Sequence, residues 1–138
     1  MRFVGLDYGK KRIGIAVSDS EGRMALPVQS FTRTKDLKGD MRRLAKLIEE
    51  YEPAKVVVGN PVALSGWSGQ SADAVRRFIS GLSLEVDAEI VLQDERFSTV
   101  EASRRLREAN MSEKAQRQVI DAAAAAVILQ QYLDGRQS

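Results

Sequence analysis

The 138-residue sequence predicts an α/β fold in which a five-stranded mixed sheet is flanked by helices. The first thirty residues alternate short β-rich runs with turns, a pattern typical of a β-meander. The rest of the chain alternates helical periodicity with short, nearly all-apolar runs, as expected of parallel strands buried on both faces. We therefore expect three strands, a helix, a strand, a helix, a strand and two helices, in a single domain covering residues 1–138.

The expected meander has three strands. Residues 2–6 form the first, and a tight turn is expected over residues 7–11. The return strand covers residues 13–17, and residues 26–31 make the third strand. Asp7 therefore falls where the first strand passes into its turn.

The middle of the chain changes period. Apolar residues recur at helical spacing from Leu37 to Ile48, and Pro53 ends that helix. Residues 55–59 are expected to form a central parallel strand. A loop over residues 60–70 follows. Beyond it the pattern predicts the second helix and the fifth strand, over residues 74–82 and 89–92.

The sequence predicts two further helices. Ser98 and Glu101 have the spacing of a capping box, so one helix is expected from Ser98 to about Asn110. The last helix is expected over residues 116–133. Its middle is the alanine run 122–126, and such small residues allow a helix backbone to lie close to a sheet.

The composition excludes several chemistries. The chain has no His and no Cys, so disulfides, zinc sites built on thiolate or imidazole, and catalysis by a Ser-His-Asp or Cys-His arrangement are excluded. Catalysis is left to carboxylates, Lys, Tyr or hydroxyl groups. Carboxylate oxygens without softer ligands favour Mg²⁺ or Mn²⁺ as the cofactor. We found neither a signal-peptide pattern nor an apolar run of membrane-spanning length, and therefore expect a cytoplasmic protein.

Three acidic positions are candidates for a metal site: Asp7, the pair Asp94-Glu95 at the end of the fifth strand, and Asp121 before the alanine run. Parallel sheets place their sites beyond the carboxyl ends of the strands, so the first two are expected at one edge. Each has a simpler explanation. Asp7 could cap its turn, Asp94 and Glu95 could pair with Arg96 in solvent, and Asp121 could be a first-turn acid favoured by the helix dipole.

Positively charged groups lie next to these acids in the sequence. Lys10, Lys11, Arg12 and Arg96 are candidates to hold phosphates, although each cluster could equally be a solvated face. The helix start at Ser98 would offer backbone N–H groups to an anion. Trp67, in a Gly-flanked loop, could stack on an unpaired base, or could pack on the protein or on a partner subunit.

Four sequence blocks, in order, resemble motifs of the YqgF family, also called RuvX. The first is Gly5-Leu6-Asp7-Tyr8-Gly9 with its continuation to Asp19, and the second is Val57-Val58-Gly59-Asn60-Pro61. The third runs from Asp94 to Ala102, and the fourth joins Ile120-Asp121 to the segment 125–130. The resemblance covers almost the whole chain, whereas the Gly-x-Asp-x-Gly pattern alone would be weak.

The resemblance implies a ribonuclease H-like fold, related to the Holliday-junction resolvase RuvC. It implies a metal-dependent nuclease with acids at Asp7, Glu95 (or its neighbour Asp94) and Asp121. Such a set of acids could hold two Mg²⁺ ions about 4 Å apart, one to activate water and one to stabilise the leaving oxygen. Family members are linked to maturation of the 5′ end of pre-16S rRNA, and some have been proposed to resolve four-way DNA junctions. Resolution of a junction requires two cuts and hence a homodimer.

The chain departs from the family at one position and leaves two other function classes to consider. Ser65 stands where family members commonly have an acid after the fourth strand. The same Gly-x-Asp-x-Gly opening also occurs in actin-like and sugar-kinase ATPases, but those proteins clasp a nucleotide between two such domains. The third hypothesis is a non-catalytic RNA-binding or assembly module that has kept the fold.

Overall fold

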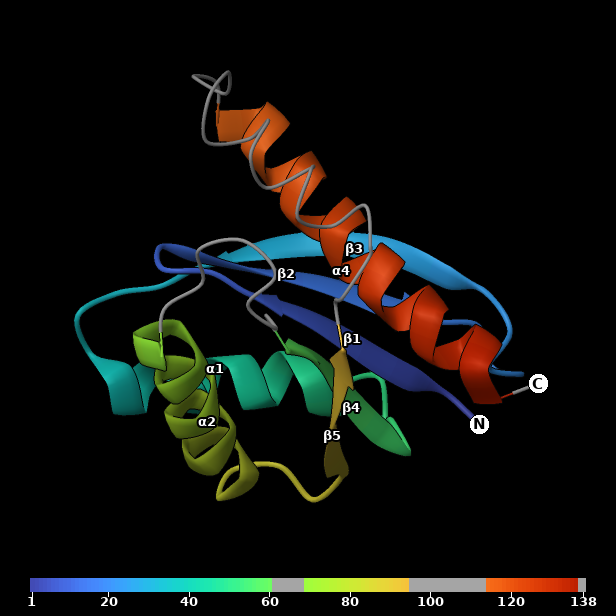
Figure 1. Ribbon diagram of the computed structural model, residues 1–138, viewed down its shortest axis with the longest axis horizontal. Helices are drawn as coiled ribbons and strands as arrows, with labels where there is room; N and C mark the ends of the chain where they lie inside the picture. Colours follow the sequence, from blue (N-terminus) through green and yellow to red (C-terminus); the bar gives the residue numbers. More distant parts are fainter. Residues whose placement is uncertain (61–68, 95–113, 137–138) are drawn as a thin grey trace.

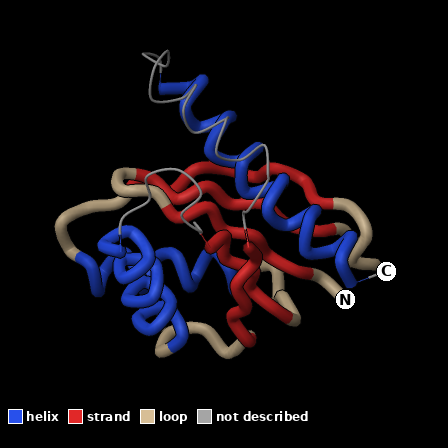
Figure 2. Tube along the Cα trace, viewed as in Figure 1, coloured by secondary structure: helices blue, strands red, loops and turns tan. Residues whose placement is uncertain are grey.

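The computed structural model describes residues 1–60, 69–94 and 114–136, which form a sheet with helices on both faces (Figures 1 and 2). Helices α1 and α2 cover one face of the sheet, and α4 crosses the other face (Figure 1). The elements are β1 (Phe3–Tyr8), β2 (Arg12–Ser18), β3 (Ala25–Thr32), α1 (Leu37–Glu49), β4 (Lys55–Asn60), α2 (Gly69–Ser83), β5 (Glu89–Asp94) and α4 (Lys114–Arg136).

The strands lie in the order β3-β2-β1-β4-β5. The first three form the expected antiparallel meander, while β1, β4 and β5 run parallel. Parallel pairing brings the carboxyl ends of these three strands to one edge of the sheet. The mixed five-stranded sheet predicted from the sequence is therefore confirmed.

Side-chain alternation along the strands divides the core in two. On the face covered by α1 and α2, large residues of the strands such as Leu6 and Ile15 pack against Leu44 of α1 and Phe78 of α2. On the opposite face, Phe3, Ala16 and Val57 pack against buried residues of α4, namely Ala124, Ala125, Ile128, Leu129 and Leu133.

The sheet carries small residues where α4 packs against it, among them Gly5 and Ala16. A Cβ atom added to Gly5 would lie 2.7 Å from the Cβ atom of Leu129, closer than real Cβ atoms approach. Ala125, in the alanine run of α4, is fully buried in the same place. The small residues of the helix and of the sheet thus allow the close approach that the alanine run predicts.

Two expected boundaries were wrong, and both concern acidic residues. Strand β1 continues to Tyr8, so Asp7 lies inside the strand and not in the turn. The turn is closed later, where the Gly9 N–H donates to the carbonyl of Arg12 at 3.0 Å. Helix α4 begins at Lys114, which puts Asp121 two turns into the helix and excludes its interpretation as a first-turn acid.

The helix expected from Ser98 to Asn110 lies outside the described residues. Among the helices that are described, none is long and apolar enough to cross a membrane.

Candidate active site

Asp7 lies on the α4 face of the sheet, next to the carboxyl end of β1. It follows Leu6, which faces α1 and α2, so alternation turns Asp7 toward α4. Its exposed fraction is only 2%. In register, Asp7 pairs with Gly14 of β2, and Gly14 pairs with Ser30 of β3. One row across three strands therefore reads Ser30, Gly14, Asp7.

Helix α4 brings the second carboxylate onto the middle of this row. A Cβ atom on Gly14 would lie 1.9 Å from the backbone carbonyl oxygen of Asp121, so only Gly fits beneath the helix here. Asp121 has an exposed fraction of 2%. Adjacent strands are about 4.8 Å apart, so Asp7 lies one strand spacing from the residue that Asp121 covers. The structure thus places two of the three predicted acids on the same face of the sheet, on neighbouring strand positions.

Two donors hold the side chain of Asp121. Arg12 Nε donates to Asp121 Oδ2 at 2.6 Å, and Ser30 Oγ donates to the same oxygen at 2.7 Å. The Arg12 side chain is 21% exposed and that of Asp121 is 3% exposed, so this ion pair is shielded from water more than a surface pair. The guanidinium group supplies the positive charge that a buried carboxylate requires.

The third predicted acid, Glu95 or its neighbour Asp94, was expected at the end of the fifth strand. Glu95 and the side chain of Asp94 lie outside the described part of the chain. In the described part of β5, Val91 faces α4, as Asp7 does in β1. Val91 packs in the α4 cluster, and Gln93, two residues further on, pairs in register with Gly59. No group of three metal-binding side chains occurs within the residues that are described.

A basic pocket of about 510 Å³ lies beside the Arg12–Asp121 pair. Lys10, Lys11 and Arg12 line it, as the sequence predicts for residues that hold phosphates. Arg33 and Lys35 also line it, from the segment that follows β3, and the remaining lining residues are Thr32, Thr34 and Gln118. Five cationic side chains around one pocket form an electrostatic footprint suited to a phosphate backbone.

Sequence reasoning missed three residues of this region. Ser30 and Arg33 reach the site only through strand pairing and loop folding, and Lys35 lies with them at the pocket. Arg33 Nη1 donates to the carbonyl oxygens of Gly9 and Lys10 at 2.9 and 2.8 Å, which ties the hairpin turn to the segment after β3. A polar Ser inside a strand is the one sequence signal that could have indicated Ser30.

Several predicted site residues cannot be placed. Arg96, Ser98 and Trp67 lie outside the described residues, and so does Ser65, the position of the family departure.

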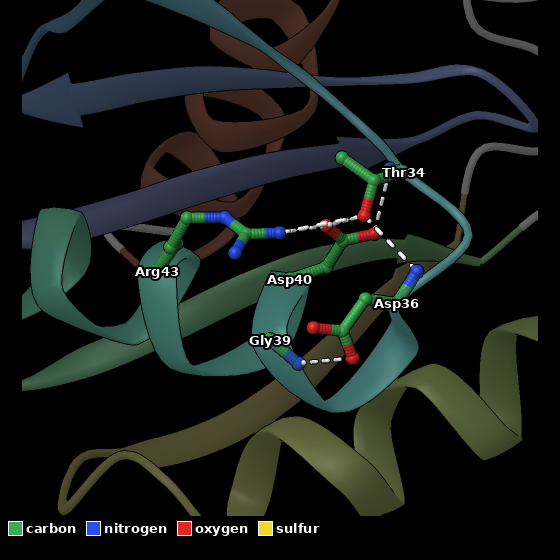
Figure 3. A network of polar contacts seen from close by, with 5 residues as sticks. All are labelled: Thr34, Asp36, Gly39, Asp40 and Arg43. Atoms are coloured by element: carbon green, nitrogen blue, oxygen red, sulfur yellow. Dashed lines mark hydrogen bonds and ion pairs between the residues drawn. The ribbon is translucent and has the colours of Figure 1, made fainter.

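A further buried carboxylate lies on the opposite face, at Asp40 of α1 (Figure 3). Thr34 donates to it through its backbone N–H at 2.9 Å and through its hydroxyl at 2.8 Å, and Arg43 forms an ion pair with it. Burial raises the pKa of Asp40, but these donors outweigh burial and hold the pKa below its usual value. We conclude that Asp40 joins the segment after β3 to α1.

Comparison with known proteins identifies close relatives. The model of a family described as RuvX, Holliday junction resolvase, matches residues 1–135. A relative from Rhodococcus opacus is 45% identical across 98% of this chain and 78% of its own length, and one from Geobacillus sp. is 42% identical across 99% of this chain and 100% of its own. Both are named as candidate pre-16S rRNA nucleases.

Solved structures share the fold. RuvC of Thermus thermophilus in complex with a Holliday junction substrate matches with a TM-score of 0.61 at 13% identity, covering 100% of this chain and 96% of that chain. A fowlpox virus resolvase, also in complex with Holliday junction DNA, matches with a TM-score of 0.56 at 13% identity and covers both chains completely. At this identity the likeness establishes the ribonuclease H-like fold.

Proposed function

Because this chain belongs to the RuvX family, we propose that it is a divalent-metal-dependent nuclease that hydrolyses phosphodiester bonds of structured nucleic acid. The observation that carries the proposal is the pair of buried carboxylates, Asp7 and Asp121, on one face of the sheet beside a basic pocket. Acid and base occur together there in the combination that binding and cleaving a phosphate backbone requires.

The donor chemistry of the site suits Mg²⁺ or Mn²⁺. Asp7 and Asp121 offer carboxylate oxygens, which hard divalent cations prefer, and a chain without His or Cys offers no softer ligand. A bound divalent cation would activate the attacking water and stabilise the leaving oxygen. We assign the third ligand to Glu95, with Asp94 as the alternative. This assignment rests on the sequence and on the family resemblance.

The chain's own residues have separate tasks in this proposal. Arg12 and Ser30 orient the Asp121 carboxylate through Oδ2, and Arg12 balances its charge. Lys10 and Lys11, which are exposed at the hairpin turn, hold phosphates of the substrate. We keep Arg96, the helix start at Ser98 and Trp67 as further contacts to nucleic acid, on sequence grounds alone.

The substrate we propose is the 5′ end of pre-16S rRNA, since relatives at 42–45% identity carry that name. The alternative is a four-way DNA junction, which the description of the family favours. That alternative requires a homodimer, because a junction is resolved by two cuts. A cytoplasmic, single-domain protein over residues 1–138 fits either substrate and belongs to the same proposal.

A side-by-side cleavage assay tests this function. Purified protein is incubated with a 5′-labelled pre-16S rRNA fragment and with a four-way DNA junction, at the same salt concentration, in Mg²⁺, Mn²⁺ or EDTA. We expect cleavage of the RNA that requires metal. Faster cleavage of the junction would favour resolvase activity. Tight binding of both substrates without any metal-dependent cleavage would contradict the proposal and favour a non-catalytic module.

A further inference from the structure

A second hollow lies on the face of the sheet opposite Asp7. It has a volume of about 250 Å³ and is lined by the end of β1, the first half of α1, the start of the segment after β3 and the part of α2 from Ala74 to Gly81. Tyr8, Met41 and Phe78 contribute its apolar walls, and Arg33 and Arg77 line it as well. A cavity of about 150 Å³ is enough to bind benzene, so this hollow has room for one flat ring system.

The walls of the hollow suit an aromatic ligand. The rings of Tyr8 and Phe78 are in contact, with centroids 4.5 Å apart. Arg33 lies over the Tyr8 ring, with Cζ 4.8 Å from the centroid. Leu37 lines the hollow and is 56% exposed, which is high for a large apolar residue. Apolar and aromatic walls with a few polar or charged groups are typical of sites that bind a flat ring, and guanidinium N–H groups can donate to the acceptor atoms of such a ring.

Gly81 of α2 keeps this hollow open. Gly81 lies in the last turn of α2, where Gly costs up to about 1 kcal/mol relative to Ala, and this cost calls for a reason. Crowding is not that reason, because the nearest atoms to an added Cβ are Cγ and Sδ of Met41, at 3.7 and 3.9 Å. A larger side chain at position 81 would instead project into the hollow, which Gly81 lines.

The hollow is connected with the basic pocket through Arg33, which lines both. Tyr8 and Asp7 are adjacent in β1, and alternation turns them to opposite faces of the sheet. The basic pocket and the hollow therefore lie on the two sides of the Arg33 side chain, and a strand with its phosphates in the basic pocket has the hollow as its neighbouring site.

We propose that this hollow binds one unpaired nucleobase of the substrate strand, and that it thereby sets the register of the strand relative to Asp7 and Asp121. The inference rests on the proposed function, since it takes the strand in the basic pocket to be the substrate. Bases of RNA and DNA share the required chemistry, and the experiment includes both.

The test compares two variants at one position. Gly81→Leu fills the hollow, whereas Gly81→Ala adds a methyl group that meets Met41 at ordinary contact distance and serves as the matched control. Binding of fluorescein-labelled single-stranded 12-mers, RNA and DNA, is measured by anisotropy in EDTA, where no cleavage competes. A second pair of 12-mers carries the same backbone without bases. Circular dichroism verifies folding, and Ala74→Leu fills the hollow from another position of α2 should Gly81→Leu not fold.

We expect Gly81→Leu to weaken binding of the normal 12-mers about tenfold and to leave binding of the base-free 12-mers unchanged. Gly81→Ala should bind as the wild type does. A preference of the hollow for RNA or DNA would appear as a larger loss for that 12-mer. Equal binding of normal 12-mers by the wild type and by a folded variant with the hollow filled would overturn the inference. This outcome is separate from the nuclease assay, because a wild type that cleaves while its filled variants bind normally would refute the base site alone.

Discussion

Asp40 on the α1 face and Asp121 on the α4 face are both buried carboxylates, at 0% and 2% exposure, but their partners lie at very different distances along the chain. Asp40 is held by Thr34 and Arg43, which are six and three residues away. Asp121 is held by Ser30 and Arg12, which are 91 and 109 residues away. The first arrangement secures one loop, whereas the second exists only when two strands, β2 and β3, are assembled with α4.

Asp40 and Asp121 are buried for different purposes. The Asp40 network can form while α1 forms, because all its donors are neighbours (Figure 3). Around Asp121 the sheet carries Gly and Ser in place of the large residues on its other face, and the same row contains Asp7. Large apolar residues there would have added stability, so we interpret the α4 face as the one shaped for chemistry.

The largest effect should come from exchanging one acid on each face. We expect Asp7→Asn to lower metal-dependent cleavage by more than about 100-fold, because even the loss of a group behind a metal ligand costs about 10- to 100-fold. Asp40→Asn, assayed well below its melting temperature, should cleave at nearly the wild-type rate. Initial rates with Mg²⁺ measure both. Equal cleavage by Asp7→Asn and wild type would trace the activity to a contaminant. The α4 face would then have no greater part in cleavage than the α1 face.

The close contact at Gly14 should give the next largest effect. In Gly14→Ala the new Cβ would lie 1.9 Å from the Asp121 carbonyl, so α4 must shift away from the sheet. We expect a loss of about 3 kcal/mol in the free energy of unfolding, at the upper end for overpacking. Gly135→Ala, near the end of α4, is the control, since nothing lies within 4 Å of its added Cβ. Urea denaturation measures both, and equal stability would show that the helix tolerates displacement.

Asp40→Asn should reduce stability at pH 7 by about 2 kcal/mol, because the donors of Thr34 and Arg43 lose a charged acceptor. The folded-state pKa of Asp40 lies below its unfolded value, so its contribution is complete above the unfolded pKa and is lost as pH falls through the folded pKa. Wild type should therefore lose more stability than Asp40→Asn between about pH 5 and pH 2. Melting temperatures across this range measure the difference, and parallel curves would contradict it.

The smallest effect is expected from Ser30→Ala, which removes one of the two donors to Asp121 Oδ2. We expect a loss of about 1 kcal/mol in stability and about tenfold weaker binding of Mn²⁺. Titration with Mn²⁺ followed by electron paramagnetic resonance measures the affinity without any substrate. Thr32→Ala, on the same strand, is a control that leaves the Asp121 contacts in place. Unchanged affinity in Ser30→Ala would mean that Arg12 alone orients the carboxylate.

Local patterns predicted much of this molecule correctly. The three strands of the meander, the helical periodicity of α1 and the buried strand β4 follow from spacing within short windows, and short windows are what hydrophobic patterning reports. The absence of His and Cys directed attention to carboxylates, and the alanine run predicted that α4 lies close to the sheet. Asp7 and Asp121 were identified as candidates on these grounds and by family resemblance.

Only the tertiary structure decided how these residues meet. Strand register aligned Asp7, Gly14 and Ser30 in one row, and the docking of α4 brought Asp121 over the middle of it. The folded segment after β3 brought Arg33 to the edge of the sheet, between the two pockets. These contacts join residues up to 109 positions apart, and no local pattern encodes the register and helix docking that create them. The sequence by itself determined which groups are present, and long-range packing determined which of them form a site.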